Sequence, residues 1–407
     1  QRAGQLERIL GLGPGHHLEA ESVDRAGQRC RHLEGRDHDP DLTSRRHDQA
    51  CEPLQRYRLV SGQVPKVGSG RDQDDIEARS GHGVPATIEA VAQIRHVDVG
   101  HSATLLRVPP PLMVLDTASL YFRAFYGVPD TRKSPQHPPT NAASGLLDMT
   151  ARLIRDHSPG AVVACWDDDW RPQFRVDLLP SYKEHRVATG HEEQVPDALQ
   201  EQIPLIEALL VAAGMPPVGV PGHEADDVIG TYATICSGPV DIVTGDRDLF
   251  QLVDDASGVR VLYTARGIRQ LQIVDEAHVI EKYGVRPQQY ADMATLRGDA
   301  SDGLPGVAGI GEKTAASLLR SFDDLAGVRA AAVDASSSLA PRIRASLTAA
   351  ADYLDRAPGV VRVVCDLPVP PVPDAAPQPD LELLNAIGEE FGISSSVGRY
   401  LSAISAL

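Results

Sequence analysis

Short apolar runs alternate with longer amphipathic stretches from residue 112 onward. The short runs cover residues 112–115, 161–166 and 240–243. Continuous apolar runs of this length are typical of strands that are buried on both faces of a parallel sheet. Between them, residues 142–154 and 195–211 carry apolar positions at helical spacing. The pattern predicts an α/β fold with a mainly parallel sheet flanked by helices.

The second half of the chain continues the helical pattern. The predicted elements are helices at 275–283 and 288–296, a glycine-rich hairpin that opens a helix at 304–319, an alanine-rich helical region from about 326, and closing helices at 381–404. Two stretches lack this pattern. The polar residues 170–193 predict a mobile excursion, and the proline-rich residues 368–379 predict an extended linker.

The first 108 residues differ from the rest of the chain. They are dense in Arg, His, Asp, Gln and Gly, and their apolar residues rarely recur at helical or strand spacing. Such a composition cannot offset the entropy lost on ordering the chain. We therefore expect residues 1–110 to be a disordered extension or a non-native stretch from an over-extended gene start. A regulatory or interaction tail is the alternative.

Composition excludes several classes of protein. Hydrophobic residues make up 42% of the chain and charged residues 23%, as in soluble globular proteins, and no apolar run approaches the roughly 20 residues of a membrane span. The start of the chain lacks the layout of a signal peptide. Five scattered cysteines without a C-x-x-C pair argue against a disulfide framework or a thiolate zinc site. We expect a cytoplasmic protein without a membrane partner.

Carboxylates gather where the predicted strands end. In chain order the acidic groups are Asp116; Asp167, Asp168 and Asp169; Glu224, Asp226 and Asp227; Asp246 and Asp248; Asp299 and Asp302. In open α/β sheets the functional crevice lies outside the carboxyl ends of the strands. Mg²⁺ prefers carboxylate and water oxygens, and phosphodiester hydrolysis suits two such ions about 4 Å apart. The joint placement predicts a metal site, although any single group is also compatible with a helix cap or a surface turn.

The net charge of −17 changes this picture little. A nucleic-acid coat protein would normally be basic. A site built from carboxylates, however, is acidic until its metal ions bind and face the phosphate.

The glycine-rich hairpin is the second candidate for phosphate binding. A Gly309-Ile310-Gly311 turn that opens a helix exposes backbone N–H groups, and Lys313 adds a positive charge nearby. A Walker A loop would place the lysine directly after glycine, whereas Glu312 intervenes here. Nucleoside-triphosphate binding is therefore not predicted, and an ordinary tight turn between helices is the alternative.

Several motifs resemble those of a known protein family. They are Val114-Leu-Asp116, Tyr182-Lys-Glu-His-Arg186, Pro221-Gly-His-Glu-Ala-Asp-Asp227, Thr244-Gly-Asp-Arg-Asp-Leu249, and Gly298-Asp-Ala-Ser-Asp302 followed by the hairpin from Leu304 to Ala316. Together they resemble the 5′ nuclease family, which comprises the 5′→3′ exonuclease domain of bacterial DNA polymerase I and the flap endonucleases. The resemblance runs from about residue 112 and weakens beyond roughly residue 368.

The resemblance implies a role for each matching residue. The positions that match metal-site acids are Asp116, Asp167, Glu224, Asp226, Asp227, Asp246, Asp248, Asp299 and Asp302. Lys183 and Arg186 match basic residues of a helical arch that engages the scissile phosphate, and Arg123 matches a basic position near the active site. The positions that match a helix–three-turn–helix duplex-binding element are Gly309, Gly311, Lys313 and Thr314.

The resemblance also implies an architecture. We expect a PIN-like sheet with a helical arch, a catalytic domain at 111–284 and a duplex-binding region at 285–367. Residues 368–407 would form a proline-rich linker and C-terminal helices.

The implied activity is metal-dependent 5′→3′ exonuclease and flap endonuclease hydrolysis. The implied cofactors are two Mg²⁺ ions, which Mn²⁺ could replace, and K⁺ at the hairpin. The implied substrate is DNA with a 5′ end, flap or nick, including an RNA primer on DNA. The implied role is primer removal in replication and repair, with DNA polymerase I or ligase as partners. The resemblance further implies a monomeric, stand-alone nuclease that is associated with the nucleoid.

Some features depart from the family pattern. The stretch at 167–175 is one residue longer than usual, so Asp168 could replace Asp167 as the ligand. His223 stands where Tyr is common and Gly303 where Asn is common. The main alternative is a catalytically silent relative that binds branched DNA. A haloacid-dehalogenase-type phosphatase would need a second aspartate after Asp116, and a small ribonuclease of the same fold would not need the hairpin.

Overall fold

A computed structural model describes most of the chain from residue 109 to residue 407. Positions 131, 133, 135, 136 and 191 lie outside the described residues, as does nearly all of the predicted N-terminal extension. Two short N-terminal strands, β1 (Leu18–Glu21) and β2 (Arg56–Leu59), pair antiparallel within a separate unit. No described helix is long and apolar enough to cross a membrane.

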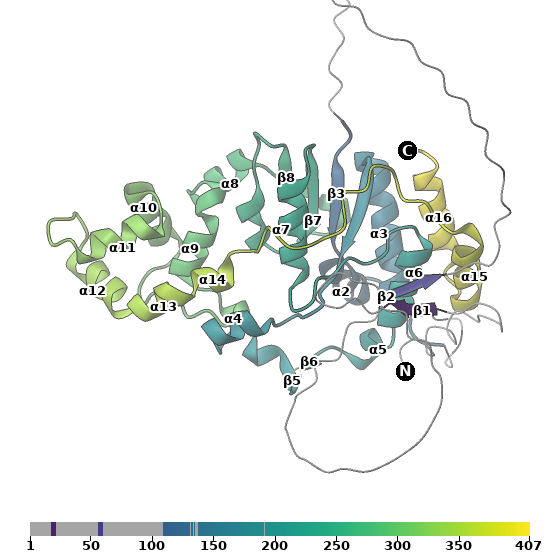
Figure 1. The fold of residues 1–407 in the computed structure, drawn as a ribbon, viewed down its shortest axis with the longest axis horizontal. Helices are drawn as coiled ribbons and strands as arrows, with labels where there is room; N and C mark the ends of the chain where they lie inside the picture. Colours follow the sequence, from purple (N-terminus) through teal and green to yellow (C-terminus); the bar gives the residue numbers. More distant parts are fainter. Residues whose placement is uncertain are drawn as a thin grey trace, which may run out of the picture. The chain divides into compact units, whose positions relative to one another are not determined.

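A mostly parallel sheet forms the centre of the unit that contains residues 109–407. Its described strands are β3 (Leu112–Asp116), β4 (Ala161–Cys165), β7 (Val240–Thr244), β8 (Val259–Tyr263) and β9 (Gln272–Val274). They are arranged in the order β4-β3-β7-β8-β9 (Figure 1). The first four are parallel, and β9 runs antiparallel to β8. The three strands predicted from apolar runs are confirmed, whereas β8 and β9 were not predicted.

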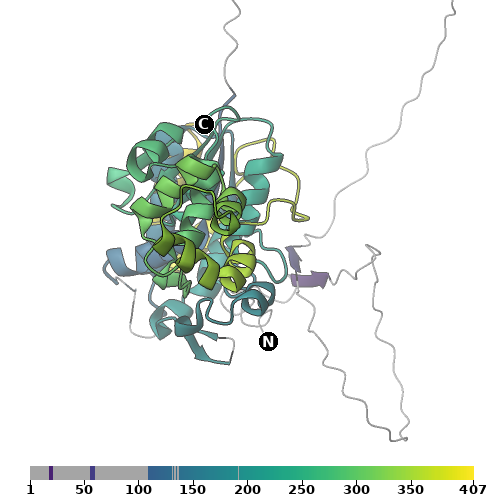
Figure 2. The same ribbon diagram turned by 90° about the vertical axis from the view of Figure 1, so that its left-hand side faces the viewer.

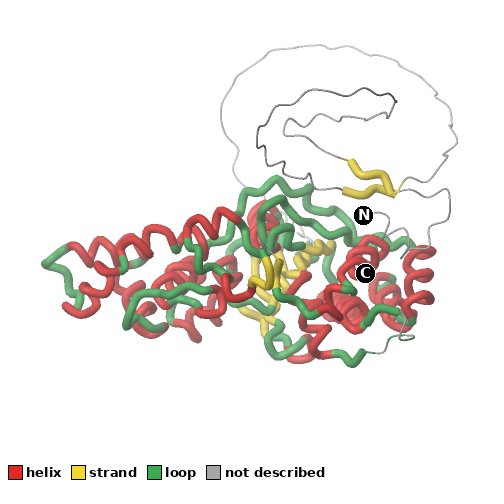
Figure 3. The backbone as a smooth tube through the Cα atoms, turned by 90° about the horizontal axis from the view of Figure 1, so that it is seen from below, coloured by secondary structure: helices red, strands yellow, loops and turns green. Residues whose placement is uncertain are grey.

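The sheet is buried on both faces, which explains the continuous apolar runs in β3 and β4. Along β3, Leu112 and Val114 pack into one core, and Met113 and Leu115 pack into the other. Helix α7 (Ala225–Ile235) contributes to the first core. The helices of the second core are α2 (Thr117–Gly127), α3 (Asn141–His157) and α6 (Ile203–Ala212). Figure 3 shows the strands in yellow with helices on either side.

The predicted helix at 195–211 is divided in two. A short helix, α5 (Asp197–Gln200), precedes α6, and Pro204 lies in the first turn of α6. Proline is tolerated in a first turn but lacks the N–H that a helix interior requires. The proline therefore marks a new start.

A group of short helices lies to one side of the sheet, as Figures 1 and 2 show. Its members are α8 (Glu276–Tyr283), α9 (Tyr290–Arg297), α10 (Glu312–Phe322), α11 (Leu325–Val333), α12 (Pro341–Ala349), α13 (Ala351–Arg356) and α14 (Pro358–Val361). These elements confirm the helical pattern predicted from residue 275 onward. Helix α16 (Ser394–Ile404) packs against α3, and α15 (Leu381–Phe391) packs against α6.

The segment between α14 and α15 is extended, as predicted, but it is not a free linker. Leu367, Val369 and Val372 pack against the first core. The hydroxyl of Tyr232, on α7, donates a hydrogen bond to the carbonyl oxygen of Pro370 at 3.1 Å. The segment therefore packs against the first core and is hydrogen-bonded to α7.

The predicted polar excursion contains regular structure. It includes α4 (Gln173–Leu178), a 3-10 turn (Glu184–Arg186) and the short strands β5 (Val187–Thr189) and β6 (Glu192–Glu193). Arg175 and Tyr182 are buried within it. The apolar pattern gave no sign of these elements, because polar side chains of this segment find buried partners at α7.

Candidate active site

Asp116 ends β3 and caps α2. Its carboxylate accepts a hydrogen bond from the backbone amide of Ser119 at 3.0 Å and one from the hydroxyl of Thr244 at 2.6 Å. Burial raises the pKa of Asp116 to about 6 despite these bonds, and the nearby charge of Asp246 adds to the rise. Because Thr244 ends β7, this hydrogen bond ties the carboxyl ends of two neighbouring strands together.

Asp167 and Asp168 follow β4 and bind different partners. Asp167 accepts a hydrogen bond from the amide of Ala225, the first residue of α7, at 2.7 Å. Burial raises the pKa of Asp167 to about 7, and the charge of Glu224 contributes to the rise. Asp168 instead accepts from the backbone amide of Gly222 at 3.0 Å. The structure therefore places Asp167 at the start of α7 and gives Asp168 a loop-closing contact.

Glu224 caps the N-terminus of α7 and binds three donors from the segment at 170–193. Arg175 donates to it at 2.5 Å and the hydroxyl of Tyr182 at 2.8 Å, while the ammonium of Lys183 pairs with its other oxygen. Lys183 has a φ of 48°, which is a strained conformation for a lysine. Its amide donates to the carbonyl oxygen of Asp302 at 3.0 Å, and this contact holds the conformation.

Asp227 is fully buried and committed to structural partners. Its two oxygens accept hydrogen bonds from Arg175 at 2.7 and 2.9 Å, and one also accepts from the amide of Val364 at 2.8 Å. This carboxylate has no exposed surface. The structure thus gives no support to Asp227 as a metal ligand. Its contacts make it the residue that positions Arg175 and fastens the extended C-terminal segment to α7.

A cavity beside α7 brings several of the predicted acids together. Its polar lining consists of Arg175, Tyr182, Lys183, Glu224, Asp226, Asp246, Asp248 and Asp302. Burial raises the pKa of Asp226 and of Asp248 well above the usual range, and the charge of Asp246 raises both further. These carboxylates come from α7, from the turn after β7 and from the segment after α9, so the fold brings together most of the predicted acids.

Of Asp299 and Asp302, only one side chain lies at the acidic cavity. The carboxylate of Asp302 lines the cavity and accepts a hydrogen bond from Arg186 at 2.8 Å. Asp299 does not line it and lies near the guanidinium groups of Arg297 at 3.5 Å and Arg247 at 3.9 Å. Of this predicted pair, the structure brings only Asp302 to the acidic cavity.

Arg123, on α2, lies beside the turn that follows β7. Its Nη2 is 3.5 Å from the position that a Cβ would take at Gly245. Its Nε is buried and has no hydrogen-bond partner among the described residues. An unpaired buried guanidinium N–H is costly unless a ligand or water satisfies it, so this donor is available for an anionic group.

The glycine-rich hairpin opens α10 as predicted. Gly309 has a φ of 79°, in the left-handed region that favours glycine, and Gly311 caps the helix. No atom lies within 4 Å of the position that a Cβ would take at Gly311. Lys313 is exposed and Thr314 partly exposed in the first turn. The backbone is therefore open to a phosphate here.

The donor set fits a hard divalent cation in its chemistry. Within the described part of the chain, no three His, Cys, Asp or Glu side chains stand in a metal-coordinating arrangement, and Glu224 is bound by Lys183 and Arg175. The donors at the cavity are nevertheless all carboxylates, and burial raises the pKa of several of them. Buried carboxylates that repel one another are stabilised by a bound cation. In the chemistry of their donor oxygens, these residues therefore fit divalent ions.

Sequence reasoning missed the polar residues that support the acids. Thr244 binds Asp116, and Tyr182 and Arg175 bind Glu224. Tyr182 and Thr244 each begin one of the motifs that resemble the 5′ nuclease family, so their place in the sequence could have indicated a supporting role. Arg175 lies outside these motifs, and its burial depends on partners 49 and 52 residues away.

Comparisons with known proteins give the same family for residues 111–381. Residues 111–284 match the family model of the 5′-3′ exonuclease N-terminal resolvase-like domain, and residues 285–381 match that of the 5′-3′ exonuclease C-terminal SAM fold. A 5′-3′ exonuclease of Streptomyces coelicolor is 56% identical over 301 residues, which cover 72% of this chain and 100% of that protein. One from Mycobacterium tuberculosis is 45% identical over 317 residues, covering 73% of this chain and 98% of that protein.

More distant relatives match the same part of the chain. DNA polymerase I of Mycobacterium tuberculosis is 39% identical over 272 residues, which cover 66% of this chain but 29% of the polymerase. Among solved structures, the T5 D15 protein co-crystallised with metal ions is similar with a TM-score of 0.51 and 19% identity, covering 72% of this chain and 99% of that one. At this identity the likeness shows the fold alone, a mostly parallel sheet flanked by helices.

Proposed function

The chain belongs to the 5′-3′ exonuclease family, and we propose that it hydrolyses phosphodiester bonds of DNA at a 5′ end, flap or nick. The observation that carries this proposal is the acidic cavity. Asp226 reaches it from α7, Asp246 and Asp248 from the turn after β7, and Asp302 from the segment after α9, and Lys183 lies among them. Several carboxylates from different elements are what a two-ion phosphodiesterase site requires.

We assign the ion-holding role to the acids around this cavity and at the strand ends. They are Asp116, Asp167, Glu224, Asp226, Asp246 and Asp248. Bound divalent ions, Mg²⁺ in our proposal with Mn²⁺ as a substitute, would supply an activated water and stabilise the leaving oxygen. Asp227 serves instead to hold Arg175, as its buried contacts support.

Three cations act on the substrate phosphate in this proposal. Lys183 offsets the negative charge that develops on the phosphate, and its pairing with Glu224 places its ammonium at the cavity. Arg186 is held beside the cavity by Asp302. Arg123 offers its unpaired Nε–H near the turn after β7. Each cation is positioned before the substrate arrives, so little reorganisation is needed during the reaction.

The hairpin would grip the duplex away from the cut. The open backbone at Gly311 and the exposed Lys313 suit phosphate contacts, which carry no sequence information. Cleavage should therefore depend on DNA structure rather than on base sequence. We propose that residues 111–284 form the catalytic part and residues 285–367 the duplex-binding part, with K⁺ at the hairpin.

We also propose a place for this activity in the cell. A 5′ flap or an RNA primer on DNA suits removal of primers during replication and repair. DNA polymerase I and ligase would then act on the same nicked duplex.

The test is cleavage of a 5′-labelled flap duplex in Mg²⁺. Short 5′ products should appear with the unaltered chain and disappear in EDTA and with Asp226→Asn, which keeps the shape of the side chain but removes its charge. Asp374→Asn, in the exposed C-terminal segment, is the matched control and should cut normally. A flap that is bound but left intact in both Mg²⁺ and Mn²⁺ would assign the chain to branched-DNA binding without cleavage.

A further inference from the structure

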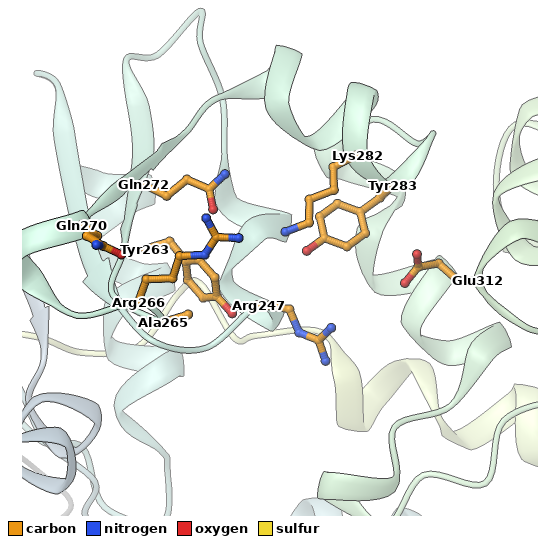
Figure 4. A pocket seen from close by; sticks show the side chains of 9 residues that line it. All are labelled: Arg247, Tyr263, Ala265, Arg266, Gln270, Gln272, Lys282, Tyr283 and Glu312. Carbon is orange, nitrogen blue, oxygen red and sulfur yellow. The ribbon is translucent and has the colours of Figure 1, made fainter. Parts of the chain in front are cut away.

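A second cavity of about 400 Å³ lies beside the sheet and contains none of the acidic cavity's residues. It is lined by Arg247, Tyr263, Ala265, Arg266, Gln270, Gln272, Lys282, Tyr283 and Glu312. These residues come from the ends of β8 and β9, from the turns that follow β7 and β8, and from the ends of α8 and α10 (Figure 4). Its volume is within the range of small-molecule sites, about 300–1,000 Å³.

The charge of this cavity is opposite to that of the chain. Arg247, Arg266 and Lys282 contribute three positive charges, and Glu312 contributes one negative charge, in a chain whose net charge is −17. Within the described residues no carboxylate forms an ion pair with Arg266 or Lys282. Figure 4 shows the terminal groups of these two residues directed toward the same space. Unpaired cations that converge on one space suit an anion such as a phosphate.

The rest of the lining suits a flat, polar ring. Tyr263 lines the cavity with its aromatic ring, and Gln272 adds an amide whose nitrogen already lies 3.2 Å from Nε2 of His278, which leaves its oxygen as an acceptor. The ring of Tyr283 packs against Phe250, Tyr290 and the ammonium of Lys282, so Tyr283 offers its hydroxyl rather than its ring face. The hydroxyl of Tyr283 is buried, has no hydrogen-bond partner among the described residues, and points into the space in Figure 4. Tyr283 itself is only 6% exposed. A buried hydroxyl without a partner is uncommon, and a bound ligand would satisfy it.

We infer that this cavity binds a single nucleotide, with its phosphate on Arg266 and Lys282 and its base against the ring of Tyr263, hydrogen-bonded by the Tyr283 hydroxyl and Gln272. Base stacking on aromatic rings and phosphate pairing with cations are the interactions that proteins use for unpaired nucleotides. Arg247 connects the two sites, because it lies between Asp246 and Asp248 in sequence and lines the second cavity.

The nucleotide has two possible sources with the same chemistry. It is either a free 5′-mononucleotide, such as the enzyme would release, or an unpaired nucleotide of the bound DNA. The first source needs only binding to the protein. The second rests on the proposed function, because it requires DNA at the acidic cavity.

The first experiment measures binding of thymidine 5′-monophosphate to the full chain by calorimetry, in EDTA and in Mg²⁺. The double variant Arg266→Ala/Lys282→Ala should weaken binding at least tenfold. Arg152→Ala/Arg155→Ala removes the same charge from the exposed face of α3 and should change it less than twofold. Thymidine and inorganic phosphate, tested separately, should each bind more weakly than the nucleotide. Asp226→Asn should bind thymidine 5′-monophosphate normally, which separates this site from the acidic cavity.

The second experiment uses Asp226→Asn, so that the DNA stays intact, and measures binding of flap duplexes with and without one additional unpaired nucleotide. The unpaired nucleotide should strengthen binding severalfold, and Arg266→Ala/Lys282→Ala added to this variant should remove the gain. A gain in this arm without binding of the free nucleotide assigns the site to the DNA strand. Failure of both arms, or equal binding by the double variant and its control, overturns the inference. Loss of cleavage in the flap assay would leave the first arm unaffected.

Discussion

The acidic and the basic cavities differ in how their charges are held. At the acidic cavity, buried carboxylates share the buried Arg175 and the partly buried Lys183 through short ion pairs. At the basic cavity, Arg266 and Lys282 are exposed and have no carboxylate partner among the described residues. Charges held by fixed partners are pre-organised for chemistry, whereas exposed and unpaired charges are free to bind and release a ligand.

The comparison also shows what the buried cations do. Arg175 holds Glu224 and Asp227 on α7 and donates through Nε to the carbonyl oxygen of Val360, on α14, at 3.0 Å. It thus joins the acidic site to the group of helices that carries the hairpin. Among the described residues, no cation that lines the basic cavity is itself buried or joins two elements through such ion pairs.

The largest effect is expected from Arg175→Met. This change leaves Asp227 buried without its cation and Glu224 with Lys183 alone, and breaking a buried ion pair by removing one partner costs about 3–5 kcal/mol. The free energy of unfolding, measured by urea denaturation, should fall by that amount. Arg152→Met breaks an exposed pair with Asp156 and should change it by less than about 1 kcal/mol. Equal effects of the two substitutions would mean that Arg175 has no structural role.

Lys183→Ala should act on the reaction rather than on the fold. Glu224 keeps Arg175 and Tyr182 as partners, so the urea midpoint should move little. Loss of one group that stabilises developing charge lowers kcat by about 10²–10³-fold, equivalent to about 3–4 kcal/mol. Single-turnover cleavage of the flap substrate measures this, and Lys183→Arg should recover part of the rate. A rise in KM with kcat unchanged would instead make Lys183 a binding residue.

The strand ends could be predicted from the sequence because local pattern determines them. A strand buried on both faces appears as an apolar run, and the acid after it lies at the sheet edge. This reasoning located Asp116, Asp167 and Asp246. It missed β8 and β9, whose sequences mix polar with apolar residues, and Arg260 on β8 pairs with the buried Asp241 of β7.

The partners of each side chain could not be predicted in the same way. Asp226 and Asp227 are adjacent in sequence, yet one lines the cavity and the other is buried under Arg175. Helix geometry points adjacent side chains about 100° apart, so only the tertiary packing decides which of them faces the site. The basic cavity escaped prediction for a related reason, since its residues come from several separate segments and form no motif.

Binding of divalent ions should stabilise the protein through the acidic cavity. Burial and mutual repulsion raise the pKa of Asp226 and Asp248, and a bound cation relieves both costs. Mg²⁺ at one hundred times its dissociation constant should add about 2.7 kcal/mol to the free energy of unfolding. Thermal unfolding in Mg²⁺ and in EDTA measures the difference, which Asp226→Asn should reduce. The same gain in that variant would place the ion elsewhere.

The smallest effect is expected at the hairpin, from Lys313→Ala. This exposed lysine would contact one duplex phosphate, so its loss should weaken DNA binding severalfold and equally for all sequences. Each neutralised phosphate contributes about 0.9 to the slope of log K against log salt concentration on duplex DNA. The slope should therefore fall by about one, as measured by anisotropy between 50 and 200 mM KCl with Asp226→Asn as background. Arg155→Ala on α3 should leave the slope unchanged. If Lys313→Ala also leaves it unchanged, the duplex does not pass over α10, and the proposed division between catalytic and duplex-binding parts fails.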